Sequence, residues 1–231
     1  MRLNGPVGGP LLILAHGAGA GSDSVFLEAL AEELGEQGVR VLRFDFSYLR
    51  RAREEKRKRP PDRMPKLVDE FRQMLRECSA SRGAADQIFI GGKSMGGRVA
   101  SLLVSQGSAC DNLSGTSGSE GATSGGMFPE EMVSGVIAFG YPFYPPGRPD
   151  RWRTDHFPEI SCPLLILQGT RDRFGTPEAI QSRPELTQTR IHWLDSGDHD
   201  FKPLARTRRT QSELIKEAAQ VAAKFIHERN A

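Results

Sequence analysis

The sequence contains few cysteines, and their spacing suits neither a disulfide framework nor a metal site. Its 231 residues include only Cys78, Cys110 and Cys162, with no CxxC pair among them. An odd, scattered set of this kind is typical of proteins that work in a reducing compartment. We therefore predict a cytoplasmic protein that uses no metal.

Long apolar runs are also missing. A membrane-spanning helix needs about 18 consecutive apolar residues, and no run in the sequence approaches that length. The first apolar run, Leu11–Ala15, is also too short for the core of a signal peptide. We expect no contact with a membrane.

Strong net charge is absent, although the charge is unevenly placed. The formal net charge is +2, yet the segment Arg50–Lys66 contains nine Lys and Arg residues against three Asp and Glu residues. The remainder of the chain is therefore mildly acidic. This distribution argues against general binding to nucleic acid and singles out one basic segment.

Apolar runs alternate with amphipathic helical patterns along the chain. The six expected strands are Leu11–Ala15, Val39–Phe46, Gln87–Gly91, Val133–Phe139, Pro163–Gln168 and Arg190–Leu194, and the main expected helices are 24–37, 65–81, 94–106 and 211–228. This order predicts a doubly wound, mostly parallel six-stranded α/β sheet with helices on both faces. We expect one domain over residues 1–231, with a flexible Gly- and Ser-rich loop at Gly107–Gly126.

The only G-x-S-x-G pentapeptide, Gly92 to Gly96, lies between an expected strand and an expected helix. This strand–turn–helix setting is typical of a nucleophile elbow, in which a strained turn presents a serine at its tip. The pattern therefore indicates Ser94 as a nucleophile. The alternative is a Gly-rich turn whose serine only caps the helix.

A serine nucleophile needs a base and a carboxylate that orients it. His199 lies in the loop after the last expected strand, and Asp172 follows the strand Pro163–Gln168. The chain order Ser94, Asp172, His199 is the order expected of an α/β-hydrolase. Ordinary loop roles for Asp172 and His199 are the alternatives. Asp195, Asp198 and Asp200 are rival carboxylates, but as sequence neighbours of His199 they are poorly placed to reach its ring.

An oxyanion hole needs two N–H donors aimed at the developing charge. The N–H of Met95, directly after Ser94, is one candidate. The small residues Gly17 and Ala18, at the end of the first expected strand, let the backbone approach a substrate oxygen, and we predict the Ala18 N–H as the second donor. A plain Gly-rich turn is the alternative.

Two further segments follow expected strands at the same edge of the sheet. Tyr141, Phe143 and Tyr144 follow the strand that ends at Phe139, and we expect them to wall the substrate pocket. A rigid loop without substrate contact is the alternative. The basic segment Arg50–Lys66 follows the strand that ends at Phe46, so we expect it to overhang the pocket and attract anionic substrates. The alternative is a solvated helix end.

Four stretches of the chain resemble a known family. The strings HGAGAGSDS, GKSMGGR, GTRD and IHWLDSGDHDF look like the dienelactone-hydrolase-like branch of the α/β-hydrolases. With FDFSYLRRAREEKRKRPPDRMPKL and GYPFYPP, the chain more narrowly resembles bacterial relatives of the testis-expressed and NSL-complex subunit-3 hydrolase-like domain. The resemblance implies an α/β-hydrolase fold in which Ser94, Asp172 and His199 match the triad positions.

These observations favour a serine hydrolase that cleaves an ester or related acyl bond of a small substrate and needs no cofactor. A dinucleotide-binding domain is disfavoured, because the third glycine of a G-x-G-x-x-G pattern is replaced by Ser22 or Ser24 in either register. The remaining alternative is a weakly active or inactive interaction module on the same fold, since some relatives act as scaffolds in chromatin complexes.

Overall fold

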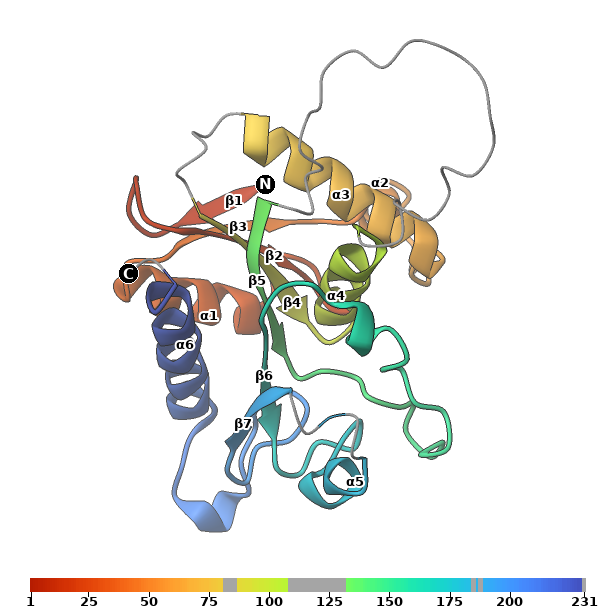
Figure 1. Cartoon of the computed structure of the whole chain (residues 1–231), viewed down its shortest axis with the longest axis vertical. Helices are drawn as coiled ribbons and strands as arrows, with labels where there is room; N and C mark the ends of the chain where they lie inside the picture. Colours follow the sequence, from red (N-terminus) through yellow and green to blue (C-terminus); the bar gives the residue numbers. More distant parts are fainter. Residues whose placement is uncertain (81–86, 108–131, 184–185, 187–188, 230–231) are drawn as a thin grey trace.

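The computed structural model describes residues 1–80, 87–107, 132–183, 186 and 189–229. Within them, seven strands form one sheet between two layers of helices (Figure 1). The strands are β1 (Arg2–Asn4), β2 (Leu11–Ala15), β3 (Arg40–Phe44), β4 (Ile88–Lys93), β5 (Val133–Phe139), β6 (Leu164–Gly169) and β7 (Arg190–Leu194).

The sheet order is β1-β3-β2-β4-β5-β6-β7, and every neighbouring pair is parallel except β1 with β3. The predicted α/β class with a mostly parallel sheet is confirmed. The predicted number of strands was six, and the structure adds β1. This edge strand is only three residues long, and Arg2 and Leu3 are exposed, so no apolar pattern marks it in the sequence.

Helices cover both faces of the sheet. The helices are α1 (Val25–Glu36), α2 (Ser47–Glu54), α3 (Met64–Ala80), α4 (Met95–Gly107), α5 (Pro177–Gln181) and α6 (Gln211–His227), with short 3-10 turns at Phe157–Glu159 and Ala205–Thr207. Leu12 and Leu14 of β2 pack with α1 and α6, whereas Leu11 and Ile13 pack with α3 and α4. Successive side chains of a strand point to opposite faces, so this apolar strand contributes to two cores.

Most of the Gly- and Ser-rich segment expected to form a flexible loop, together with Cys110, lies outside the described residues, and Gly107 is the last residue of α4. Among the residues that are described, no helix has both the length and the apolar character of a membrane span.

The parallel strands bring four connections to one edge of the sheet. Ser94 follows β4, Asp172 follows β6, His199 follows β7, and the Gly17–Ala18 loop follows β2. Ligands of open α/β sheets bind at the carboxyl ends of the strands. This edge is therefore where a site is expected.

The turn between β4 and α4 has no space for a side chain at Gly92. A Cβ atom added there would lie 2.5 Å from the Gly96 carbonyl carbon and 2.7 Å from the Ala15 carbonyl oxygen. Both contacts are with backbone, which cannot move away by rotating a side chain. Gly19, in the loop after β2, has nothing within 4 Å of the same position.

We predict that Gly92→Ala lowers the free energy of unfolding by roughly 1–3 kcal/mol, as expected for overpacking. For a chain of this size that is a fall in Tm of roughly 2–12 °C. Gly19→Ala is the control and should leave Tm unchanged in a thermal melt followed by circular dichroism. An unchanged Tm for Gly92→Ala would contradict the close packing of this turn.

Candidate active site

Ser94 lies at the tip of the turn between β4 and α4, in a strained backbone conformation. Its φ angle is +52°, in the left-handed region, which costs a non-glycine residue roughly 1–3 kcal/mol. The Ser94 N–H donates to the Phe139 carbonyl oxygen at 3.0 Å, which ties the turn to the end of β5. Strain of this kind, held in place by close packing, is typical of a residue with a functional role.

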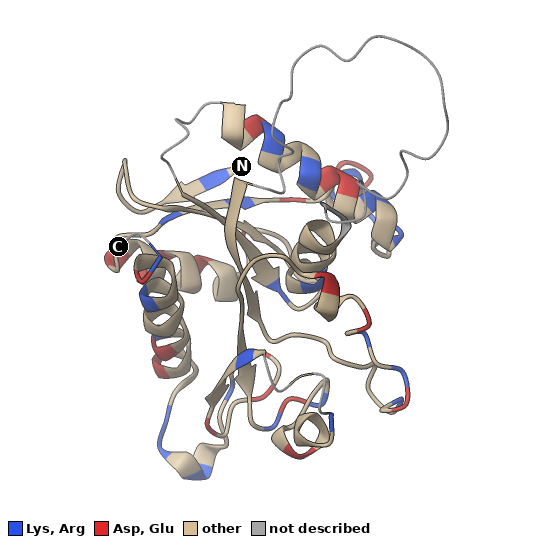
Figure 2. Cartoon of the chain, viewed as in Figure 1, with Lys and Arg blue, Asp and Glu red and all other residues tan. Residues whose placement is uncertain are grey.

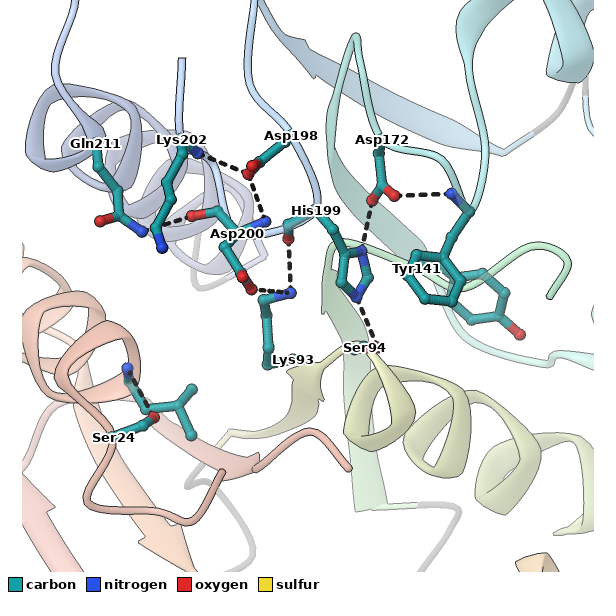
Figure 3. A network of polar contacts seen from close by, with 12 residues as sticks. Ser24, Lys93, Ser94, Tyr141, Asp172, Asp198, His199, Asp200, Lys202 and Gln211 are labelled. Carbon is teal, nitrogen blue, oxygen red and sulfur yellow. Dashed lines mark hydrogen bonds and ion pairs between the residues drawn. The ribbon is translucent and has the colours of Figure 1, made fainter. Parts of the chain in front are cut away.

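His199 lies between Ser94 and Asp172 and contacts both (Figure 3). Its Nε2 is 2.9 Å from Ser94 Oγ, and its Nδ1 is 2.7 Å from Asp172 Oδ2. A carboxylate only accepts hydrogen bonds, so Nδ1 carries the proton and Nε2 is left to accept from the serine hydroxyl. The ring of Phe174 packs against the imidazole, with ring centroids 4.3 Å apart.

Asp172 is fully buried, and three donors satisfy its carboxylate. Besides the imidazole, the Gln168 side-chain amide donates to Oδ2 at 2.9 Å and the Phe174 N–H donates to Oδ1 at 2.9 Å. Gln168 is itself fully buried and accepts from the Tyr141 N–H at 2.7 Å. Burial of a charge is tolerated only with such partners, so this network fixes the carboxylate in front of the imidazole.

The three rival carboxylates have other positions. Asp198 Oδ1 accepts from the N–H groups of Asp200 and Lys202, both at 2.9 Å, and so closes the loop that carries His199. Asp200 forms an ion pair with Lys93 at 3.4 Å, and Asp195 is exposed. Within the described part of the chain, Asp172 alone among these carboxylates is hydrogen-bonded to the imidazole.

A cavity of about 770 Å³ opens beside Ser94 and His199. Gly17 and Ala18 form one side, and the apolar side chains of Val25, Phe26 and Ile215 form another. Such a cavity accommodates the apolar part of a small organic molecule. Among the described residues, no three His, Cys, Asp or Glu side chains gather so as to hold a metal ion.

Two free N–H donors lie near the serine, those of Met95 and Ala18. Among the hydrogen bonds of the described residues, neither group donates to a protein acceptor. Met95 is the first residue of α4, where N–H groups have no partner within the helix. A Cβ atom on Gly17 would lie 3.7 Å from Ser94 Cβ, so the loop after β2 passes close to the serine.

His16 holds the loop after β2 in place through hydrogen bonds of its ring. The ring is fully buried, its Nδ1 lies 2.7 Å from the Gly17 carbonyl oxygen, and its Nε2 accepts from the Phe46 N–H at 3.1 Å. These partners define a neutral imidazole with the proton on Nδ1. Burial lowers the pKa of His16, which keeps this arrangement neutral at physiological pH.

Tyr141, Phe143 and Tyr144 do not wall the cavity, contrary to the sequence-based prediction. Tyr141 and Phe143 are fully buried, Tyr144 is 7% exposed, and none of the three lines the cavity at Ser94. They pack into a third core cluster together with residues of β6 and α5. The Tyr141 hydroxyl donates to the Arg153 carbonyl oxygen at 3.0 Å. Its ring packs in the core and its polar tip is hydrogen-bonded within the protein.

The family model of the alpha/beta hydrolase domain matches residues 9–227. The chain belongs to the alpha/beta hydrolase family. Its fold is also found in solved structures of low sequence identity. Est1E from Butyrivibrio proteoclasticus is 15% identical with a TM-score of 0.64, and the match covers 98% of this chain and 92% of Est1E.

Two other solved structures show the same fold. Dienelactone hydrolase from Anabaena variabilis is 18% identical with a TM-score of 0.65, covering 98% of this chain and 89% of that one. Monoacylglycerol lipase from Paleococcus ferrophilus is 14% identical with a TM-score of 0.62, covering 99% and 98%. Such identities support the fold alone.

Sequence reasoning missed Lys93, which precedes the serine of this alpha/beta hydrolase. Its side chain is 9% exposed, and Nζ donates to the His199 carbonyl oxygen at 2.6 Å and pairs with Asp200 (Figure 3). Burial lowers the pKa of Lys93, and the nearby Asp200 carboxylate opposes this effect. The signal in the sequence was a lysine at the end of an otherwise apolar strand. A buried strand tolerates a charged side chain only when that side chain has hydrogen-bond or ion-pair partners.

We predict that the free energy of unfolding falls as the pH drops from about 7 to 5.5. A histidine in the unfolded chain has a pKa near 6.5, whereas burial lowers the folded pKa of His16 and lowers that of His156 to about 4. Below pH 6.5 the unfolded state therefore binds more protons. The stabilisation is complete above that pH and is lost as the pH falls toward the folded values.

Urea unfolding at several pH values measures this slope. His156→Gln should make the slope shallower, because the folded pKa of His156 is lowered to about 4. Equal slopes for the parent and His156→Gln would contradict the contribution of this histidine.

We predict that Lys93→Met lowers kcat for hydrolysis of a test substrate about tenfold or more, because the His199 carbonyl oxygen loses its donor and the histidine loop loosens. The aliphatic length is retained, so packing is preserved. Lys202→Met is the control, since Lys202 lines the same cavity but is exposed. Equal kcat values for the two variants in a steady-state hydrolysis assay would show that Lys93 has no positioning role.

Proposed function

We propose that this alpha/beta hydrolase is a serine esterase that cleaves an ester or related acyl bond of a small molecule through an acyl-enzyme. The observation that supports the proposal most strongly is the continuous hydrogen-bonded series Ser94, His199, Asp172 at the edge of a cavity. A serine on a strained turn with an oriented imidazole at 2.9 Å is the arrangement that activates a hydroxyl nucleophile.

In the proposed reaction, Ser94 Oγ attacks the acyl carbon and its proton moves to His199 Nε2. Asp172 holds the imidazole in the required tautomer and stabilises the imidazolium. The N–H groups of Met95 and Ala18 donate to the oxyanion of the tetrahedral intermediate. The proton then passes from Nε2 to the leaving oxygen, which departs as an alcohol.

Water completes the cycle. It attacks the acyl carbon while His199 Nε2 accepts one of its protons, and the bond to Ser94 Oγ breaks as that proton returns to the serine. The acid is released and the hydroxyl is restored. Each of these steps uses groups of this chain and water, so the proposed reaction needs no added cofactor.

The activities named for the structural neighbours agree with this chemistry. The neighbours include an esterase domain from Rhodothermus marinus, a monoacylglycerol lipase and a dienelactone hydrolase, and each of these names denotes acyl-bond hydrolysis. We also infer the narrower kinship with bacterial relatives of the testis-expressed and NSL-complex subunit-3 domain, and a cytoplasmic location, from the sequence features described above.

We predict that p-nitrophenyl acetate is hydrolysed and that Ser94→Ala reduces kcat about a thousandfold or more. His199→Ala should cost a similar factor, because members of a triad act as a unit. Release of p-nitrophenolate, followed by its absorbance, tests this. Full activity in purified, folded Ser94→Ala would refute the mechanism.

Asp172→Asn should reduce kcat by a factor on the order of 10³–10⁴, because the amide favours the wrong imidazole tautomer. Asp198→Asn is the matched control. Its retained carbonyl oxygen still accepts from the N–H groups of Asp200 and Lys202, so activity should change little. A larger loss for Asp198→Asn than for Asp172→Asn would show that the carboxylate is misassigned.

A fluorophosphonate probe separates an enzyme from an interaction module on the same fold. The probe reacts only with an activated serine, so labelling of the parent protein and not of Ser94→Ala is expected. Absence of labelling in the parent would favour the interaction module.

A further inference from the structure

A second hollow adjoins the cavity at Ser94 on the other side of the loop after β2. It measures about 570 Å³ and shares Ala18 and Gly19 with the first cavity. The two residues are small and exposed, so they separate the hollows by the thickness of one backbone segment. A ligand that passes over this loop can occupy both hollows at once.

The second hollow, which we call the basic groove, has an apolar floor and a cationic rim. Tyr48, Leu49 and Ala52 of α2 form the floor, and every charged residue in the lining is a lysine or an arginine. The rim residues are Arg53, Lys56, Arg57, Lys58 and Arg59. Figure 2 shows the basic residues gathered at the end of α2.

Carboxylates outside the groove neutralise its three arginines. Arg53 pairs with Asp23 and Asp45 at 2.6 and 2.7 Å, and Glu55 pairs with Arg57 at 3.1 Å and with Arg59 at 2.6 Å. Among the described residues, Lys56 and Lys58 have no carboxylate within ion-pair distance, and both are exposed. Two positive charges therefore remain available in the groove.

The groove is attached rigidly to the loop that borders the serine. The Ser22 N–H donates to Asp45 Oδ1 at 2.7 Å, and Arg53 of α2 joins Asp45 and Asp23. The Tyr48 hydroxyl, in the floor, donates to the Ala18 carbonyl oxygen at 3.4 Å. These contacts fix α2, and with it the floor of the groove, against the loop that borders Ser94, as a binding subsite requires.

We propose that the basic groove binds the anionic end of the substrate, and that the enzyme prefers esters whose acyl chain ends in a carboxylate. The proposal rests on the serine esterase function proposed above. The ester carbonyl lies at Ser94, the acyl chain crosses Ala18 and Gly19, and the terminal carboxylate pairs with Lys56 and Lys58. The leaving group occupies the apolar side of the first cavity.

The span sets the length of chain required. The Gly17 Cβ position lies 3.7 Å from Ser94 Cβ, and each further residue adds at most about 3.8 Å. An acyl chain of several methylene groups is needed to carry a carboxylate from Ser94 past Ala18 and Gly19. p-Nitrophenyl adipate is therefore a suitable probe, and p-nitrophenyl adipamate is its neutral match, with an amide in place of the terminal carboxylate.

The test compares kcat/KM for these two esters in the parent and two double variants. The first variant, Lys56→Gln with Lys58→Gln, removes the unpaired charges of the groove. The second, Arg50→Gln with Arg63→Gln, removes the same net charge from exposed positions of the same segment that do not line the groove.

We expect the parent to have a higher kcat/KM for the adipate ester than for the adipamate ester. In the lysine variant the ratio of these two values should fall about fivefold, the size expected for two exposed ion pairs. The adipamate ester should be unaffected. The preference should also shrink as salt rises from about 10 to 150 mM, because the Debye length falls from about 30 to 8 Å. An equal loss in the arginine variant, or no preference in the parent, would overturn the proposal.

Binding of the p-nitroanilide of adipic acid, measured by calorimetry in Ser94→Ala, separates this subsite from the proposed function. Weaker binding in the Lys56→Gln, Lys58→Gln background supports the groove even if no ester is turned over. Equal binding in the two backgrounds overturns the groove while leaving hydrolysis of p-nitrophenyl acetate as the test of esterase function.

Discussion

The close approach of the turn after β4 to the end of β2 is the constraint on which the site depends. Gly92 and Gly96 face the Ala15 carbonyl oxygen so closely that a Cβ on either would lie within 2.7 Å of it. Because the turn cannot relax outward, Ser94 is held in its left-handed conformation. The start of α4 also lies against the His16 carbonyl oxygen, which would be 2.8 Å from a Cβ on Gly96, so Ser94, Met95 and the loop after β2 are positioned by one packing arrangement.

The histidine loop depends on this turn as well. Lys93, on the strand side of Ser94, holds the His199 carbonyl oxygen, while Asp172 holds the imidazole from the other direction. Gly140 leaves room for the hydrogen bond between Lys93 and His199, because a Cβ on Gly140 would lie 3.2 Å from Lys93 Nζ and 3.1 Å from the His199 carbonyl oxygen. The imidazole is therefore positioned through both its ring and its backbone, which limits its motion away from Ser94 Oγ.

How much the sequence predicts depends on how local the physical signal is. β2 and β5 have the predicted bounds because apolar runs mark buried strands. The hydrogen-bonded partner of His199 was identified by chain order. β1 was missed because its three residues, of which Arg2 and Leu3 are exposed, show no apolar periodicity. The aromatics at Tyr141 and Phe143 were misplaced because a strand-end position does not reveal whether a ring points to the cavity or the core. The role of Lys93 depends on a partner more than 100 positions away.

The basic segment shows how a feature of local sequence acquires a position from distant contacts. The sequence predicts that its charges overhang the pocket, but it does not reveal which of these cations form ion pairs with distant carboxylates. Arg53 forms ion pairs with Asp23, which precedes α1, and with Asp45, which follows β3. Gly21 leaves space for the Arg53 guanidinium, since a Cβ on Gly21 would lie 2.5 Å from Nη2. These ion pairs use the arginine to attach α2 to the loop after β2. Lys56 and Lys58, which follow α2, form none of these ion pairs. Arg53 therefore holds the loop after β2, whereas Lys56 and Lys58 line the groove beside it.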